Sequence, residues 1–232
     1  VIIDSGSTDG TLDVARRYTD RIFFREWDNN YGNQKQFGLG KCRGEWVFTL
    51  DADEVVGRNF ADALRFLDGK YRTMTLPRYH IIDIDKMAYI TTEPHFRNWQ
   101  LRFIKNDGVS YYYGDPVHHP LKNYRPRLRC SLANIFHLDF LVNDYGSRQQ
   151  KVDYYDKQYP GAGYPKMYLF EDFPYKTART LELPDDNVLR MLQQDKDFLR
   201  YPEYTSRWVQ WEQEMQYQAR AILTKSRAKL GV

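Results

Sequence analysis

The sequence predicts an α/β fold in which helices flank a mixed sheet. Two observations lead to this prediction. Up to residue 70, short apolar runs alternate with segments of helical pattern, which favours a mostly parallel sheet with crossover helices. Beyond residue 71, apolar runs follow one another across turns, which favours antiparallel or mixed pairing. The 232 residues are enough for one such domain and an appendage.

Three strands, each leading to a helix, are predicted in the first part of the chain. The strands are VIIDS at 1–5, RIFFREW at 21–27 and EWVFTL at 45–50. Ser7 or Thr8 is expected to cap the first helix, with Asp9 near its positive end. The apolar side of this helix would consist of Leu12, Val14, Ala15 and Tyr18. The other two helices are expected at 34–43, where Gly44 ends the helix, and at 62–67.

The pattern of apolar residues after residue 71 predicts strands first and then helices. Strands are expected within 73–83 and 99–114, and helices at 144–159, 185–201 and 203–230. The last helix carries an apolar stripe at three- and four-residue spacing, formed by Trp208, Trp211, Met215, Ala219 and Ile222. This stripe either docks on the domain or lies on a membrane surface or a partner subunit.

Composition narrows the classes of function. The net charge is +3 and basic residues are interspersed with acidic ones, so nucleic acid is not indicated as a partner. The two cysteines, Cys42 and Cys130, form no CxxC pair, which argues against a disulfide scaffold or a cysteine-based zinc site. No run approaches the ~18 apolar residues of a membrane span. We therefore expect a cytoplasmic protein.

Carboxylates follow the apolar run VFTL directly, in the segment VFTLDADEVV at 47–56. In open α/β sheets, ligands bind where the carboxyl ends of strands meet. Strand alternation would put Asp51 and Asp53 on the same side if the chain stays extended. Such oxygen ligands suit Mg²⁺ or Mn²⁺ bound to substrate phosphates. The alternative is that these residues are ordinary turn and helix-cap acids.

The order of motifs favours the metal interpretation. The turn DSGSTDGT, followed by WDNNYGNQKQFGLGKCRGEWVFTLDADE, resembles the family 2 glycosyltransferases of the GT-A fold. More narrowly, NNYGNQKQFGL, WQLRFIKND, GDPVHH, FHLDF and KVDYY resemble the branch with bacterial lipopolysaccharide-core β-glucosyltransferases. The resemblance is specific over 1–56, looser over 97–155 and absent after residue 160.

The resemblance implies a domain organisation. Residues 1–160 would form the GT-A domain, with a nucleotide half at 1–56 and an acceptor half at 57–160. Residues 161–232 would form a helical C-terminal extension. Family members have a further strand before the one that corresponds to VIID, and this first strand is missing from the sequence. We therefore expect a truncation or a segment that takes its place, and an exposed strand edge that favours a homo-oligomer.

The resemblance also implies how a nucleotide-sugar donor is bound. Asp4 would accept a hydrogen bond from N3–H of uracil, with Ser5 beside it, so the donor is expected to be a UDP-sugar. Lys35 would neutralise phosphate charge. Asp51 would bind the ribose hydroxyls or a metal-bound water, and Asp53 would coordinate Mn²⁺ or Mg²⁺. Each has an ordinary alternative, such as a solvated lysine or a turn acid.

The reaction implied is inverting transfer of the sugar to an acceptor hydroxyl. His119 stands where the family branch carries an acid and is the expected general base, with Asp115 nearby as the second catalytic candidate. His137 or His118 would supply a further metal ligand. The acceptor would be a glycan or a lipid-linked saccharide, with peripheral contact at the inner membrane face. Arg97, Trp99 and Arg102 would contact a sugar ring or an anionic acceptor, unless they have core or surface roles.

Two other functions are compatible with the same residues. A haloacid-dehalogenase-type phosphatase would use Asp51 as the nucleophile and Asp53 as the acid/base, with Asp185 and Asp186 as its downstream acidic pair. A sugar-nucleotide-binding domain without activity would keep the carboxylates and lack turnover. Hydrolysis of a UDP-sugar with Mn²⁺ would indicate the transferase, and turnover of p-nitrophenyl phosphate would indicate the phosphatase.

Overall fold

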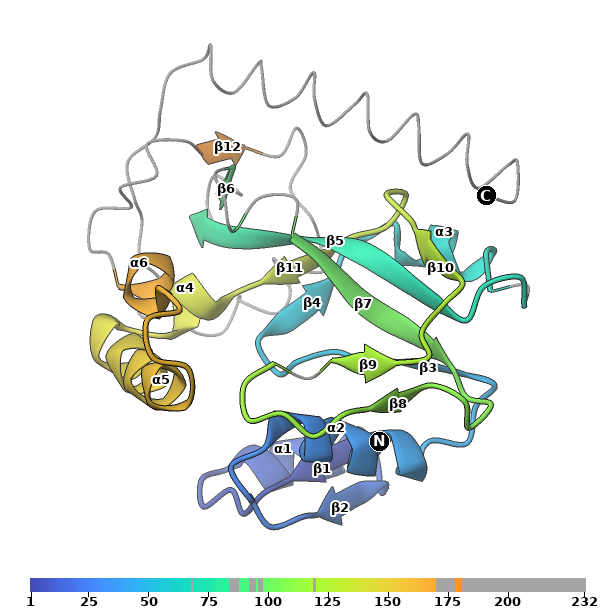
Figure 1. Ribbon diagram of the computed structural model, residues 1–232, viewed down its shortest axis with the longest axis horizontal. Helices are drawn as coiled ribbons and strands as arrows, with labels where there is room; N and C mark the ends of the chain where they lie inside the picture. Colours follow the sequence, from blue (N-terminus) through green and yellow to red (C-terminus); the bar gives the residue numbers. More distant parts are fainter. Residues whose placement is uncertain are drawn as a thin grey trace.

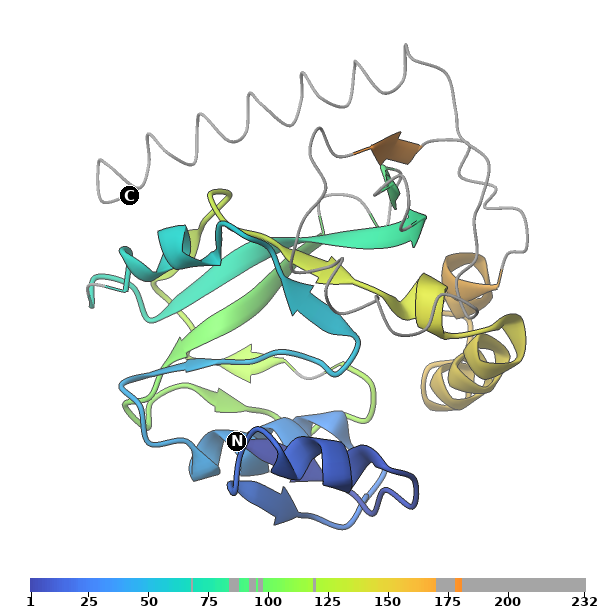
Figure 2. The same cartoon turned by 180° about the vertical axis from the view of Figure 1, so that it is seen from behind.

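The computed structural model describes residues 1–67, 69–83, 88–91, 95, 98–118, 120–169 and 178–180. These residues form a central mixed sheet, a layer made by the N-terminal residues, and a group of helices at one end of the sheet (Figure 1; the reverse view is Figure 2). The predicted α/β class is confirmed. The helices predicted at 185–201 and 203–230 lie outside the described residues.

The central sheet is organised around one long strand, β5. Within the described residues its eight strands are β3 (Trp46–Phe48), β4 (Glu54–Val56), β5 (Thr73–Asp83), β6 (Ala88–Ile90), β7 (Asn98–Lys105), β10 (Arg127–Arg129), β11 (Ile135–His137) and β12 (Ala178–Thr180). β5 pairs in parallel with β10 and β11 and antiparallel with β6 and β7. β4 pairs antiparallel with β11, β3 with β7, and β12 with β6. The sheet is mixed, as predicted.

One face of this sheet carries an apolar core. Phe48 and Phe103 from β3 and β7 contact Phe60 of the short helix α3 (Phe60–Leu64), with ring centroids 4.7 Å and 5.6 Å from that of Phe60. Met74 and Leu76 of β5 are buried in the same cluster. Each fully buried side chain of this size stabilises the fold by about 1.5–3 kcal/mol, so this core fixes β3 and β7 against β5.

The N-terminal layer consists of β1 (Ile2–Asp4), α1 (Thr11–Arg16), β2 (Ile22–Phe24) and α2 (Tyr31–Lys41). β1 and β2 pair in parallel. α2 begins earlier than predicted because the Asn30 side chain caps it by accepting from Asn33 N at 2.9 Å. α2 passes close to β1 at Gly38, where a Cβ would lie 3.1 Å from Ile3 Cγ1.

Two predictions about the first helix were wrong. α1 begins only at Thr11, and neither Ser7 nor Thr8 caps it, since the Ser7 hydroxyl is bonded to Asp4. Asp9 does serve the helix start, accepting from Thr11 N at 2.9 Å. The expected apolar side is also incomplete, because Val14 and Tyr18 are exposed.

The alternation of strands and helices in the first part of the chain predicts a mostly parallel sheet that contains its three strands. The structure differs, because these strands do not share one parallel sheet. Among the described residues, β1 pairs with β2, whereas β3 pairs antiparallel with β7. The reason is that the two edges of β7 pair with different strands, since Phe103 and Ile104 pair with β3 on one edge and with β5 on the other, which places β3 in the mixed sheet.

Three helices follow the end of β11: α4 (Asp139–Val142), α5 (Tyr145–Gln158) and α6 (Tyr164–Tyr168). The predicted helix at 144–159 is confirmed by α5, which Asp144 caps by accepting from Ser147 N at 2.7 Å. A hairpin of β8 (Tyr111–Tyr112) and β9 (Leu121–Lys122) lies against α2 (Figure 1). In the described part of the chain, every helix is too short or too polar to span a membrane.

Candidate active site

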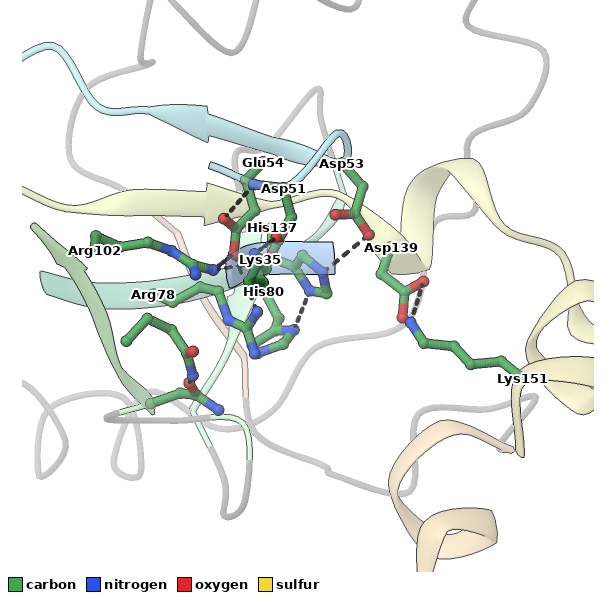
Figure 3. A network of polar contacts seen from close by, with 12 residues as sticks. Lys35, Asp51, Asp53, Glu54, Arg78, His80, Arg102, His137, Asp139 and Lys151 are labelled. Carbon is green, nitrogen blue, oxygen red and sulfur yellow. Dashed lines mark hydrogen bonds and ion pairs between the residues drawn. The ribbon is translucent and has the colours of Figure 1, made fainter. Parts of the chain in front are cut away.

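The Asp-x-Asp segment is a turn and not the extended continuation of a strand. β3 ends at Phe48, and the N–H of Glu54, the first residue of β4, donates to Asp51 O at 3.1 Å. The chain must turn here because β4 pairs with β11 and not with the partner of β3. Strand alternation would place both carboxylates on the same side only if the chain stayed extended, and the turn shows that this condition is not met. Asp51 instead contacts Lys35 and Arg102, and Asp53 contacts His137 (Figure 3).

Asp51 lies between two cations from different elements. Lys35 of α2 forms an ion pair with Oδ1, and Arg102 Nη2 of β7 lies 3.0 Å from Oδ2. The Lys35 side chain keeps an exposed fraction of 18%, whereas Arg102 is buried. Lys35, predicted to bind phosphate, thus reaches the Asp-x-Asp turn, and it is accessible to a ligand.

Beneath the turn, Glu54 is fully buried and has three donors. Its carboxylate accepts from Arg102 Nη2, from Arg78 Nη1 at 3.1 Å and from Asp51 N at 3.1 Å. Burial lowers the pKa of Arg102, but the charges of Glu54 and Asp51 outweigh this effect and raise it. A buried charge is tolerated only when it is paired in this way. Of the two roles that the sequence left open for Arg102, the structure shows the core role, because its guanidinium lies inside this network.

A chain of hydrogen bonds leads from Asp53 into the core. His137 Nε2 of β11 lies 3.0 Å from Asp53 Oδ2, and His137 Nδ1 lies 3.0 Å from His80 Nδ1 of β5. The Asp53 carboxylate accepts from His137 Nε2, and the buried His80 Nε2 has no hydrogen-bond partner within the described residues. Burial acts to raise the pKa of Asp53, but the hydrogen bond from His137 and the charges of His137 and Lys151 lower it overall.

A third histidine, His95, packs edge-on against His80. Its ring centroid lies 4.7 Å from that of His80, and its Nε2 lies 2.9 Å from Met167 O. Burial lowers the pKa of His95 to about 4 and that of His80 well below its ordinary range. Both rings are therefore neutral at physiological pH.

His95 makes the stability of the fold depend on pH. Between its ordinary pKa of 6.5 and the folded value of about 4, the unfolded chain binds a proton that the folded chain does not. The free energy of unfolding must therefore fall as pH falls through this window, by about 3 kcal/mol in total from this residue. We expect His95→Gln, which has no titrating group, to show a shallower decline in urea unfolding between pH 7 and 4. Parallel declines in both proteins would contradict the prediction.

The predicted uracil reader, Asp4, organises the turn after β1. Its carboxylate accepts from Gly6 N at 2.7 Å and from Ser7 Oγ at 2.5 Å, and these two bonds hold its pKa below the ordinary range. Gly6 takes φ of 103°, which favours glycine. The neighbouring Ser5 accepts from Gln34 Nε2 of α2 at 2.8 Å, next to Lys35 in sequence. The predicted nucleotide residues thus lie along one path from β1 over α2 to Asp51.

Asp115 holds the loop that leads to His119. Its Oδ1 accepts from Val117 N at 3.0 Å and His118 N at 2.6 Å, and its Oδ2 accepts from Tyr159 Oη at 2.7 Å. The bond to Asp115 raises the pKa of Tyr159 to about 12. His119 lies outside the described residues. His118 contacts Tyr164 Oη through Nε2 at 2.9 Å, so of the two predicted metal-ligating histidines the structure brings His137, and not His118, to Asp53.

The same loop docks on the start of α2 through Gly32, where an added Cβ would overlap Tyr113 O and lie 2.9 Å from Asp115 N. We expect Gly32→Ala to lower the free energy of unfolding by about 1–3 kcal/mol, because backbone must move to relieve the overlap. Gly40→Ala is the matched control in the same helix, since nothing lies within 4 Å of its Cβ position. The free energy of unfolding of this control should rise by about 1 kcal/mol, because alanine favours the helix more than glycine does. Thermal unfolding of both variants tests the prediction. Equal shifts of the unfolding temperature in the two variants would contradict it.

The predicted metal ligands Asp51, Asp53 and His137 are not preassembled. In the part of the chain that the structure describes, no group of three His, Cys, Asp or Glu side chains has the spacing of a metal site. Asp51 is engaged by two cations, while Asp53 pairs with a histidine and keeps an exposed side-chain fraction of 27%. Magnesium is commonly held by one or two carboxylates together with substrate phosphates. Asp53 and His137 therefore fit a divalent cation that arrives with a diphosphate.

The family can be assigned from comparison with known proteins. The family model "Glycosyl transferase family 2" matches residues 1–119, which is more than half of the chain and includes Asp4, Ser5, Lys35, Asp51, Asp53 and Asp115. The chain belongs to glycosyl transferase family 2. This confirms the resemblance read from the motifs, and it leaves the phosphatase alternative without support.

Individual glycosyltransferases match parts of this family 2 chain. It is 41% identical over 69 residues, 28% of this chain and 25% of the relative, to the lipopolysaccharide core biosynthesis glycosyltransferase LpsC of Rhizobium meliloti (strain 1021). It is 30% identical over 67 residues, 29% of this chain and 23% of the relative, to an uncharacterized glycosyltransferase of Rickettsia conorii. A Haemophilus influenzae glycosyltransferase is 24% identical over 100 residues, 40% of either chain. The chain thus spans less than half the length of each of these relatives.

Sequence reasoning missed Arg78 and His80. Both belong to β5, whose residues TMTLPRYHIID are buried at every position except Arg78, which is half-buried. Their spacing of two places them on one face of the strand, and charged or polar residues inside a buried strand need partners. That signal predicts a buried polar site on β5, but it does not reveal that Glu54 and His137 supply the partners.

Proposed function

We propose that this chain is the catalytic part of an inverting glycosyltransferase that moves a sugar from a UDP-sugar to a glycan or lipid-linked saccharide, assisted by a divalent cation. The observation that carries the proposal is the Asp-x-Asp turn, which presents Asp51 to Lys35 and the partly exposed Asp53 to His137. The acceptor class rests on the similarity to a lipopolysaccharide core biosynthesis glycosyltransferase. For a lipid-linked acceptor, the reaction would take place at the cytoplasmic face of a membrane.

The donor would lie along the path from β1 to the turn. Asp4 would accept from N3–H of uracil next to Ser5, and Asp51 would bind the ribose hydroxyls. Lys35 is accessible and would exchange part of its contact with Asp51 for the diphosphate. A divalent cation held by Asp53 and His137 would supply a Lewis acid that offsets the charge of the leaving diphosphate.

The transfer itself needs a proton acceptor. The acceptor hydroxyl oxygen would attack the anomeric carbon while the bond from that carbon to the UDP oxygen breaks, which inverts the configuration. The hydroxyl proton would go to His119. Asp115 would hold the loop that precedes His119 in place, through its hydrogen bonds with Val117 N, His118 N and Tyr159 Oη.

Isothermal titration of UDP with and without Mn²⁺ tests this proposal, followed by hydrolysis of UDP-sugars. Binding that requires Mn²⁺, with release of UDP from one donor sugar, is the expected result. If GDP or dTDP binds in place of UDP, the assignment of Asp4 to uracil fails and the transferase class stands. If UDP binds and no donor is turned over, the chain is a sugar-nucleotide-binding domain.

A further inference from the structure

A buried ion pair lies next to the Asp-x-Asp turn, on helices that the site as described does not use. Asp139, the first residue of α4, is fully buried, and its Oδ1 accepts from Asn143 Nδ2 at 2.6 Å and Lys151 Nζ at 3.2 Å. Its Oδ2 is buried and has no hydrogen-bond partner within the described ranges. Lys151 belongs to α5 and keeps an exposed side-chain fraction of 26%. The buried carboxylate therefore fixes the position of the ammonium of a partly exposed side chain, and this ammonium also lies over the Tyr168 ring, 4.9 Å from its centroid.

The ion pair is tied to Asp53 through both backbone and charge. Leu138 N, next to Asp139, donates to Asp53 O at 2.9 Å. The charge of Lys151 contributes to the lowered pKa of Asp53. Burial acts to lower the pKa of Lys151, but the charge of Asp139, with a smaller contribution from Asp53, raises it. Figure 3 shows Asp53 between the Lys35–Asp51 pair and Lys151.

The accessible charges form a row that suits a bound anion. Lys35, Asp51, Asp53 and Lys151 are all partly exposed, whereas the guanidinium of Arg102 is buried with Glu54. The two carboxylates need added positive charge when a diphosphate arrives, and an accessible cation flanks them at either end. The Lys151 ammonium has three N–H donors, of which the Asp139 contact uses one. Lys151 can therefore donate to an anion without leaving Asp139.

We propose that Lys151 binds the diphosphate of the donor, on the side of Asp53 away from Lys35, and that Asp139 is the positioning residue for this contact. The inference rests on the proposed function and deepens it. It also has a consequence for the chain, because Lys151 lies beyond the residues matched by the family model. The donor site would then be completed by helix α5, which lies outside the matched residues 1–119.

The test compares UDP with uridine, which lacks the phosphates, in the full chain with Mn²⁺. We expect Lys151→Met to weaken UDP binding by about ten- to a hundredfold, the value of a lost charge-assisted hydrogen bond. Uridine binding, followed by ligand-observed NMR, should stay unchanged, and Lys151→Arg should restore most of the UDP affinity. Lys157→Met is the matched control, because Lys157 is exposed on the same helix. This variant should bind UDP with the affinity of the unsubstituted protein.

Lys151→Met leaves Asp139 buried without its counter-charge, so the variant can lose stability. The double variant Asp139→Asn/Lys151→Met removes that charge as well and should show the same selective loss of UDP affinity in a folded protein. Equal losses for UDP and uridine would mean a structural role and overturn the inference. Normal UDP binding by both variants would overturn it while leaving the proposed function intact. If the unsubstituted protein binds no nucleotide diphosphate, the proposed function and the inference both fail.

Discussion

Asp53→Asn is expected to abolish the Mn²⁺-dependent part of UDP binding and to slow sugar transfer by about a hundredfold or more, since Lewis-acid stabilisation is worth several kcal/mol. The amide preserves the size of the side chain but removes the charge that would hold the cation. It can still accept a hydrogen bond from His137 Nε2, which lies 3.0 Å from the present carboxylate oxygen. The local structure should therefore survive. Isothermal titration of UDP at saturating Mn²⁺ and the rate of UDP release give the two readouts.

Asp13→Asn is the control for a change of charge alone, because Asp13 is exposed on α1 and pairs with Arg16. It should bind UDP and turn over donor like the unsubstituted protein. Unchanged Mn²⁺ dependence in Asp53→Asn would contradict the assignment of Asp53 to the cation. Loss of UDP binding with and without Mn²⁺ would instead assign Asp53 directly to the nucleotide.

Arg102→Met is expected to cause the largest loss of stability, about 3–5 kcal/mol in the free energy of unfolding. Arg102 Nη2 contacts both Glu54, which is fully buried, and Asp51 at 3.0 Å. Without Arg102, the buried Glu54 carboxylate loses one of its two cationic partners. It keeps the other, Arg78, whose Nη1 lies 3.1 Å away. Urea unfolding at pH 7 measures the loss.

The double variant Arg102→Met/Glu54→Gln separates lost charge pairing from lost packing. Replacing both members of a buried ion pair with neutral residues of similar volume is often tolerated, so the double variant should recover most of the stability. A double variant as unstable as Arg102→Met would show that the packing of the arginine stem, and not the unpaired carboxylate, causes the loss.

The sequence by itself determined features that depend on neighbours along the chain. The apolar run before Asp51 predicts a strand that ends in carboxylates, and the motif order from Asp4 to Glu54 indicates the glycosyltransferase family. The pattern at 144–159 predicts a helix, and α5 confirms it at Tyr145–Gln158. Each signal is local, because apolar periodicity and turn residues act within a few residues.

Tertiary structure alone decided which side chains meet at the turn. Asp51 and Asp53 have different partners because β4 must reverse to pair with β11. His80 and His137 are 57 residues apart, and they touch because β5 and β11 pair in one register. A shift of one residue in that register would turn either side chain to the other face of the sheet. The types of residue in the candidate site can therefore be read from the sequence, while their contacts follow from strand pairings that no local pattern specifies.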